Sequence, residues 1–488
     1  SLIHDGGGLA PGLARDLEEA IAIWHRDRRG DPDAAEAAYS RALSHDPTNA
    51  ALLAELAKLQ RRARGRPLVD SLLRLSQTTG GDLDLLGEAA EVAVNSVGDR
   101  ALAKSIFDRL LKLAAERWLG ATEPNVLTSG TPQAPENYVD RATRELVRIY
   151  SDDGDHDKVV QLLTDTAHLP WKEEKARSLR HEAARVAVEK LGATDRAIGI
   201  YLALIDEDPH DAEAVARIVA LYESGGRQHE LLDLKRRLVG TAREVGERLT
   251  LRLEVAALED QLGDVEKAIT ALRDNLGESA RHDATVKMLA ALLQREEKIG
   301  ELESLLASQA QLAEDANDRT VAADFFWRAA QVAETQMKDL PRAIGHLRRV
   351  VALEERPPAY DALARLSTDT NAYDDAAGFL DRLRELTTGA ERAAVTLRLA
   401  DALVSANRKP EARERLESEI ARDPEADRVR VRLADTYRTA QDWPALAVLL
   451  TEGAHYAPDK ATRLARLREA AELHRSRTNE PEKAIPLL

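Results

Sequence analysis

The chain has 488 residues, more than one compact hydrophobic core usually holds, so its length indicates several domains or one repetitive array. Hydrophobic residues make up 44% of the sequence but aromatic residues only 4%, which favours many thin helical layers over one thick core. The formal charge of −16 disfavours general binding to nucleic acid or anionic membranes, and the absence of cysteine excludes disulfides and cysteine-bound metals.

The chain opens with a glycine-rich stretch, residues 1–12, that we expect to be a flexible lead-in. Helical periodicity begins near Leu13 and continues with short breaks to Leu488, and no convincing alternating strand interrupts it. The sequence therefore predicts an all-α protein.

The clearest single helix lies within residues 30–47. Its first turn can be capped by Asp31, and Pro47 prevents its continuation. Its apolar residues fall on one stripe: Ala35, Ala38, Tyr39, Ala42 and Leu43. One such short helix cannot bury its stripe alone, so we expect neighbours of the same kind.

Small or aliphatic residues equivalent to Ala35 recur along the whole chain. Apart from one longer step between Ala103 and Val159, successive steps are about 33–41 residues, which is typical of helix–turn–helix arrays. The equivalent positions are Val69, Ala103, Val159, Ala197, Leu231, Ala268, Leu302, Ala343, Ala376, Ala412, Leu446 and Ala484.

At Ala35, Tyr39, Ala42 and Pro47 the chain resembles the tetratricopeptide repeat (TPR) family, which places small, aromatic, small and proline residues at this spacing in its second helix. Later units match this TPR pattern only in part, as does the unit that contains Ala197. The resemblance implies an α-solenoid, a right-handed superhelix of about 13 helix–turn–helix repeats. It further implies a concave side, lined by first helices, that binds a peptide or helical segment of a partner.

A second, longer period is superimposed on the single repeat. After Val159 the steps alternate between long and short, so pairs of units recur at intervals of about 70–74 residues, roughly two repeats. The longer units have extended first helices, expected at residues 171–191, 243–262, 318–337, 390–407 and 459–477. We expect alternate first helices to protrude and to shape the binding groove.

The longer step between Ala103 and Val159 contains a proline- and glycine-rich segment, residues 119–136, which we interpret as an inserted loop. The alternatives are a boundary between two solenoid segments and a loop that grips a partner. The segment separates repeats at 13–118 from repeats at 137–488. The last repeat is incomplete, so we expect either further chain or another subunit to cover its apolar end, the second case giving self-association.

Two sets of residues are candidates for partner binding. The aromatic set is Phe325 and Trp327, beside Phe326 on one first helix, with Trp171 and Tyr222 elsewhere; each is either a core residue or an exposed anchor. The basic set is Arg61, Arg62 and Arg64, which form either a solvated face or a contact for an acidic peptide.

No assembled catalytic motif is found, so we predict a non-enzymatic protein-interaction scaffold without cofactor or metal. The segment beginning at His229 lacks the second histidine of a zinc protease, and the acidic turn at Asp153, Asp155 and Asp157 lacks the glycine and glutamate of a calcium loop. The alternative is an arm of a larger enzyme or of a secretion or envelope assembly. No apolar run spans a bilayer, so direct membrane insertion is not expected; cytoplasmic and bacterial periplasmic locations both fit.

Overall fold

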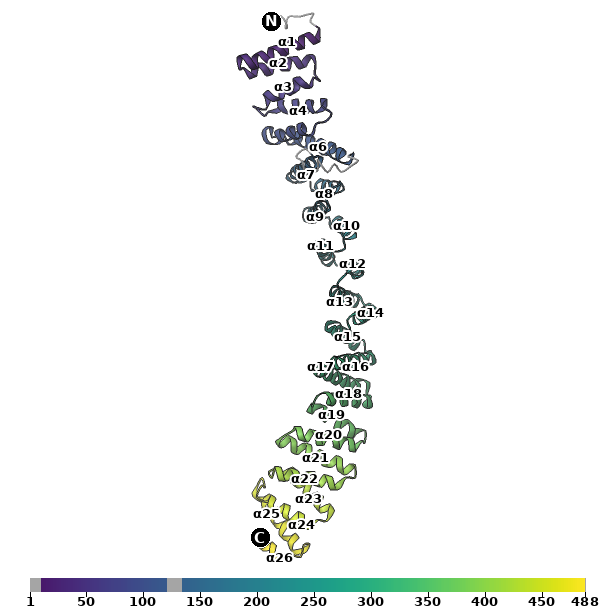
Figure 1. The fold of residues 1–488 in the computed structure, drawn as a ribbon. Helices are drawn as coiled ribbons and strands as arrows, with labels where there is room; N and C mark the ends of the chain where they lie inside the picture. The colour runs from purple at the N-terminus through teal and green to yellow at the C-terminus, as the bar shows by residue number, and fades with distance from the viewer. Residues whose placement is uncertain (1–9, 121–133, 488) are drawn as a thin grey trace. The chain divides into compact units, whose positions relative to one another are not determined.

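The computed structural model describes residues 10–120 and 134–487, in which 26 α-helices follow one another and no strand occurs (Figure 1). By its internal contacts the chain divides into two units, Ser1–Leu231 and Leu232–Leu488, with the division inside α12 (Gln228–Thr241). The predicted all-α fold is confirmed.

Odd-numbered helices are the first helices of the hairpins and even-numbered helices the second. The first unit contains α1 (Pro11–Trp24), α2 (Pro32–His45), α3 (Ala50–Gln60), α4 (Arg66–Thr78), α5 (Leu83–Val92), α6 (Arg100–Gly120), α7 (Pro135–Asp152), α8 (His156–Ala167), α9 (Glu173–Glu189), α10 (Thr194–Glu207) and α11 (Ala212–Ser224). Single π-helical turns, η1 (His25–Arg29) and η2 (Ala93–Val97), extend α1 and α5.

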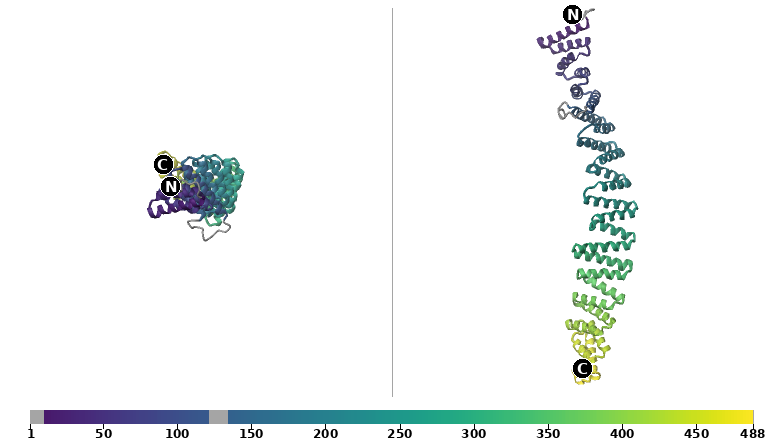
Figure 2. Two further views of the ribbon diagram at one scale, coloured as in Figure 1. Left: turned by 90° about the horizontal axis from the view of Figure 1, so that it is seen from above. Right: turned by 45° about the vertical axis from the view of Figure 1, so that its right-hand side comes forward.

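The second unit continues the same pattern, and Figure 2 shows its hairpins stacked in chain order. Its helices are α13 (Val245–Gln261), α14 (Val265–Glu278), α15 (Asp283–Arg295), α16 (Ile299–Asp315), α17 (Arg319–Val332), α18 (Leu340–Leu353), α19 (Pro357–Asp369), α20 (Tyr373–Leu386), α21 (Gly389–Ser405), α22 (Lys409–Arg422), α23 (Asp427–Ala440), α24 (Trp443–Gly453), α25 (Lys460–Ser476) and α26 (Pro481–Ala484). A π-turn, η3 (Ala333–Met337), extends α17, and a 3-10 turn, η4 (Ile485–Leu487), follows α26.

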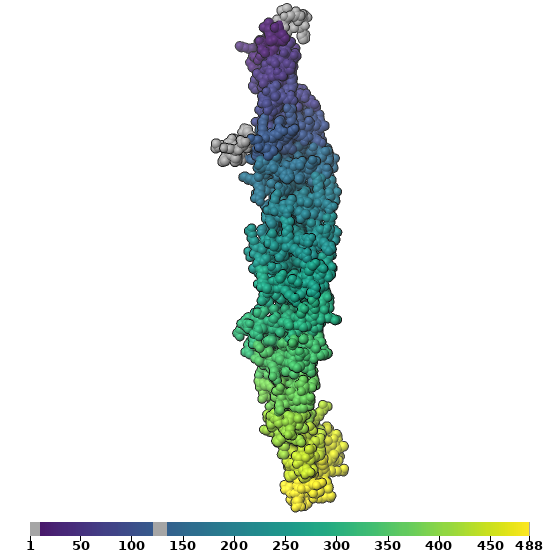
Figure 3. Space-filling view, turned by 90° about the vertical axis from the view of Figure 1, so that its right-hand side faces the viewer, coloured from purple at the N-terminus to yellow at the C-terminus, as the bar shows by residue number. Residues whose placement is uncertain are grey.

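The residues that mark the repeat are core residues of the second helices. Every marker lies on an even-numbered helix, from Ala35 on α2 to Ala484 on α26, and every one is buried. Where the marker is alanine, the small side chain allows the first and second helices to approach closely. Figure 3 gives a space-filling view of the chain, coloured by residue number.

Local sequence signals mark the ends of several helices. The carboxylate of Asp31 accepts the backbone N–H of Ala34 at 3.1 Å, and Asp442 caps α24 through Ala445 in the same way. The turn after η1 is closed by Gly30 at a φ of 61°, a left-handed conformation that favours glycine.

First helices alternate in length from α9 onward, as predicted. α9, α13, α21 and α25 each have 17 residues and α17 has 14 before its five-residue π-turn, whereas α11, α15 and α19 have 13 and α23 has 14. The role of this alternation in shaping a binding groove remains a prediction.

The long first helices share a feature that sequence reasoning missed. In four of them, an arginine near the start of the helix reaches the end of the second helix of its own hairpin, so the contact recurs once per pair of repeats. The contacts are Arg177 to Asp208 at 3.2 Å, Arg248 to Glu278, Arg319 to the Ala352 carbonyl at 3.0 Å, and Arg392 to Glu419 at 2.9 Å. Each contact fixes one end of its hairpin.

One of these arginine contacts gives a pH prediction. Hydrogen bonds donated by Arg248 and Arg252 lower the pKa of Glu278 to about 2. Because the pKa is lowered on folding, the stabilisation is present above the unfolded-state pKa and is lost as the pH falls through about 2. An NMR titration of the Glu278 carboxyl should show this midpoint, and Arg252→Gln should raise it.

Arg273→Gln is the matched control for that titration, because Arg273 pairs with Glu301 on another helix. It should leave the Glu278 midpoint in place. A midpoint near the ordinary glutamate value in the unmodified protein would contradict the prediction.

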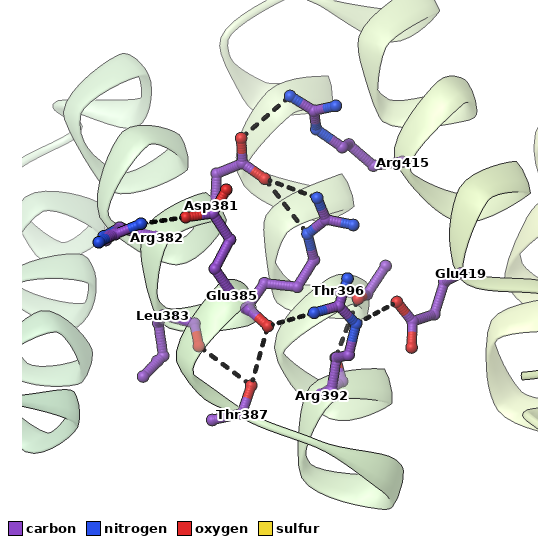
Figure 4. Close-up of polar contacts among 10 residues, drawn as sticks. Asp381, Arg382, Leu383, Glu385, Thr387, Arg392, Thr396, Arg415 and Glu419 are labelled. Carbon is purple, nitrogen blue, oxygen red and sulfur yellow. Dashed lines mark hydrogen bonds and ion pairs between the residues drawn. The ribbon is translucent and has the colours of Figure 1, made fainter. Parts of the chain in front are cut away.

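A buried polar cluster joins α20, α21 and α22 (Figure 4). The Arg392 guanidinium donates to the Arg384 carbonyl at 2.7 Å and to the Glu419 carboxylate at 2.9 Å, and all three residues are buried. Asp381 accepts from Arg384 and from Arg415, at 3.1 and 3.0 Å. Three helices are thus tied together by charge-assisted hydrogen bonds.

The segment predicted as an inserted loop, residues 119–136, is helical at both ends. α6 continues to Gly120 and α7 begins at Pro135, where proline suits the first turn of a helix. Residues 121–133, and residues 1–9 of the predicted lead-in, lie outside the described residues. Within the described ranges, no helix combines the length and apolar character needed to cross a bilayer.

Candidate protein-binding surface

Ion pairs bridge successive first helices along the surface that these helices form. Each pair joins an arginine to a carboxylate on the next or the preceding first helix. Examples are Asp260 with Arg295, Glu334 with Arg365, Asp361 with Arg398, Asp401 with Arg432, and Arg438 with Glu469. We call this series the ion-pair ladder; it neutralises these arginines within the chain itself.

The ion-pair ladder is interrupted between α15 and α17. No ion pair joins residues within these two helices in the described part of the chain. Arg281 pairs with Asp318 at 3.3 Å across the turns that precede them, and further along the helices the side-chain link is a pair of amides, with Gln294 and Gln336 donating to each other at 3.0 and 3.1 Å. A hollow of about 580 Å³ lies at this place. It is lined by Lys287, Ala290, Ala291, Gln294, Leu302, Leu306, Arg328, Gln331, Val332, Thr335 and Gln336.

The α15–α17 hollow has an apolar floor, and its walls combine amide and hydroxyl groups with the apolar residues Ala290, Ala291 and Val332. The floor consists chiefly of buried Leu302 and Leu306 from α16, while the glutamines and Thr335 on the walls are exposed. Amide side chains both donate and accept hydrogen bonds, so they can pair with a peptide backbone. The hollow therefore offers hydrogen-bonding groups above a shallow apolar base.

Two cations line the α15–α17 hollow. Lys287 pairs with Asp283 on its own helix at 2.6 Å. Arg328 has no carboxylate within ion-pair distance among the described residues; its guanidinium lies 5.6 Å from the centre of the Phe325 ring. Such a cation–π contact orients an arginine without neutralising it. Arg328 thus remains available to a carboxylate from outside the chain.

The aromatic candidates on α17 divide between burial and partial exposure. Phe326 is buried, 5% exposed, in the core between α17 and α18, and Phe325 and Trp327 are half-buried against the same core. Sequence reasoning therefore selected the helix that lines the hollow but not Arg328, whose lack of a carboxylate partner depends on the surrounding helices. A role for Phe325 or Trp327 in binding remains a prediction.

Comparisons with known proteins give structural likeness only. No protein-family profile matches the chain, and no curated protein matches it. Similar solved structures include one titled Naa15/Naa10 bound to HypK-THB (14% identity, 97% of this chain, 89% of that chain, TM-score 0.25) and the yeast Tom70 crystal structure (12%, 97%, 99%, 0.24). The P58(IPK) TPR domain is a third (14%, 80%, 98%, 0.19).

TM-scores this low do not support an assignment of the fold. The hairpins of the chain itself indicate the type of repeat. Buried small or aliphatic residues recur on each second helix, at steps that lie near the 34-residue period of helix–turn–helix TPR units. The fold is a TPR-like repeat.

The TPR-like first unit places Trp171 beside a smaller hollow of about 190 Å³ that is lined from α7, α8 and α9. The Trp171 ring packs edge-on against Trp118, with ring centres 4.6 Å apart, and its indole N–H donates to the Thr166 carbonyl at 2.9 Å. Trp171 is half-buried and oriented by these contacts. Whether it contacts a partner remains a prediction.

Tyr222 lies in the core of the TPR-like first unit. Only 5% of the residue is exposed, and burial raises the pKa of its phenol. In this structure its ring is therefore packed inside the repeat and does not present a free surface.

The basic set after α3 is largely paired within the chain. Arg61 forms a two-point contact with Glu88 at 2.7 and 2.8 Å, and Arg62 pairs with Asp33. Arg64 occupies the turn before α4 with a φ of 48°. Arg61 and Arg62 would have to leave these partners before binding an acidic peptide, which makes them weaker candidates than Arg328.

The acidic turn considered for calcium forms ion pairs with nearby cations. Asp155 pairs with Lys158, and Asp157 with Arg196 at 2.5 Å. Across residues 10–120 and 134–487, no group of three or more metal-ligating side chains is arranged to hold a metal ion.

Proposed function

We propose that this TPR-like chain is a non-enzymatic scaffold that binds an extended acidic peptide segment of a partner protein in the α15–α17 hollow. The observation that carries the proposal is the position of Arg328: it lines the hollow where the ion-pair ladder is interrupted, and it contacts an aromatic ring instead of a carboxylate.

The shape and lining of the hollow support a peptide as the ligand. Gln294, Gln331 and Gln336 extend polar groups along one open hollow, and an extended peptide presents N–H and C=O groups at regular intervals. The floor over Leu302 and Leu306 suits a small apolar side chain. The volume also lies within the range of ligand sites in proteins.

The charge of the hollow supports an acidic sequence. An arginine and a carboxylate form a charge-assisted hydrogen bond that is stronger than a neutral one. The overall charge of −16 disfavours acidic ligands in general. A local cationic site would therefore determine where on the chain an acidic peptide binds and in which register.

A peptide titration tests this proposal. The probes are two fluorescein-labelled peptides, one of alternating alanine and glutamate and one with glutamine in place of glutamate. We expect the glutamate peptide to bind more tightly. Because a hydrogen bond to a charged group contributes about 1.5–3 kcal/mol, Arg328→Gln should weaken that binding by roughly tenfold to a hundredfold, as measured by fluorescence anisotropy.

Arg365→Gln is the matched control, since Arg365 lies on the next first helix and already pairs with Glu334. It should leave the affinity unchanged. Equal binding of the two peptides, or an affinity insensitive to Arg328→Gln, would overturn the proposed function.

A further inference from the structure

The second helices of the second unit form a separate groove between α22 and α24. Its volume is about 670 Å³, and α23 forms its floor. The walls are mainly apolar, with Ile420 and Pro424 on one side and Val448 and Leu449 on the other. Val448 and Tyr456 are 52% and 43% exposed and add to the apolar surface of the groove.

A buried arginine lies in this α22–α24 groove. Arg430 is 2% exposed, and the single hydrogen bond of its guanidinium in the described structure is from Nη2 to the Pro424 carbonyl. Its Nε–H is buried without an acceptor. The guanidinium lies 5.5 Å from the centre of the Tyr456 ring, at the exposed end of the groove.

The other buried arginines of this unit differ from Arg430 in having a carboxylate partner. Their pairs are Arg384 with Asp381, Arg392 with Glu419, and Arg466 with Asp427. Burial, together with the charge of nearby Arg466, lowers the pKa of Arg430. Asp427 and Glu452 lie close enough to attract the guanidinium, but neither forms an ion pair with it among the described residues. A buried cation without a direct counter-ion is costly, so its absence here requires an explanation.

The surrounding charges limit which ligand could supply the counter-ion. Glu417 is already bound by Arg413 at 2.6 Å and by the Tyr437 hydroxyl at 2.7 Å. Glu452 and His455 are exposed and also line the groove. The negative charge of Glu452 disfavours a run of acidic residues but leaves room for one carboxylate beside Arg430.

We infer that the α22–α24 groove docks an apolar segment of a partner protein that carries a single carboxylate, which pairs with Arg430. Apolar side chains of the segment cover Val448 and Tyr456, and the carboxylate supplies the missing counter-ion. This site lies on the second helices and is independent of the proposed α15–α17 site.

The missing side chain of Gly453 leaves the space that Arg430 occupies. A Cβ atom added to Gly453 would overlap Cδ of Arg430, so the arginine side chain passes directly over the glycine. Gly453→Ala should therefore displace the guanidinium while retaining its charge, and this provides a second way to perturb the site.

Binding of two short labelled peptides of leucine and alanine, one with a central aspartate and one with asparagine, tests the inference. We expect the full chain to prefer the aspartate peptide by about tenfold. Arg430→Met should abolish the preference while keeping the fold, because an apolar replacement of similar length removes an uncompensated buried charge. Gly453→Ala should reduce the preference.

Arg428→Met is the matched control, since Arg428 is exposed on the same helix and does not line the groove. It should retain the preference, and so should Arg328→Gln, which separates this site from the proposed function. Equal affinity for the two peptides overturns the inference. So does concentration-dependent self-association in sedimentation that Arg430→Met abolishes, because the occupant would then be a second copy of the chain.

Discussion

Replacing Glu419 by alanine is expected to destabilise the α20–α22 region by about 3–5 kcal/mol, because it leaves the buried guanidinium of Arg392 without its carboxylate. The side chain of Glu419 is 1% exposed, so water cannot readily replace it. The remaining acceptor of Arg392 is the Arg384 carbonyl, a neutral group.

The effect should be local, because a repeat array unfolds by segments. Native-state hydrogen exchange of the amides in α20, α21 and α22 is therefore the appropriate measurement. Glu385→Ala is the control: Glu385 pairs with Arg382 in an exposed position, and such pairs contribute about 0–1 kcal/mol.

A double replacement distinguishes an unpaired charge from lost packing. Arg392→Met combined with Glu419→Leu removes both charges and should recover most of the stability, since apolar pairs of similar volume often replace buried ion pairs at little cost. Equal protection in Glu419→Ala and in the unmodified protein would show that Arg392 finds another partner or water.

The fold was predictable because it depends on local patterns. Small residues such as Ala35 and Ala343 recur at similar intervals, and capping residues such as Asp31 mark helix ends. Both signals depend only on residues that are near one another in the sequence. The alternation of first-helix lengths was also readable from spacing, since α9 and α13 differ from α11 and α15 by one turn.

The candidate sites were not predictable, because they depend on which charges find partners one hairpin away. Nothing local to Arg328 or Arg430 separates them from Arg365 or Arg392, whose partners Glu334 and Glu419 lie on other helices. Only the assembled helices show which arginines have no carboxylate. The hollows likewise depend on packing between hairpins.

Phe326→Ala is expected to cost about 3–5 kcal/mol in the α17–α18 hairpin, the range for truncating a buried phenylalanine. The ring packs in the core, stacks on His346 with centres 6.0 Å apart, and has the Arg349 guanidinium 5.2 Å from its centre. Alanine would leave a cavity and remove both contacts.

The neighbouring residues of α17 provide the internal comparison, because consecutive helical residues point about 100° apart. Trp327→Ala should reduce the stability of the hairpin less, since Trp327 is only half-buried. Arg328→Ala should leave the hydrogen-exchange protection of α17 and α18 unchanged but should weaken the binding of the glutamate peptide. Loss of peptide affinity in Trp327→Ala without loss of protection would identify that ring as a binding anchor. Loss of protection with unchanged affinity would assign the Trp327 ring to the core. Neighbouring residues of α17 would then have different roles, some in stability and others in peptide binding.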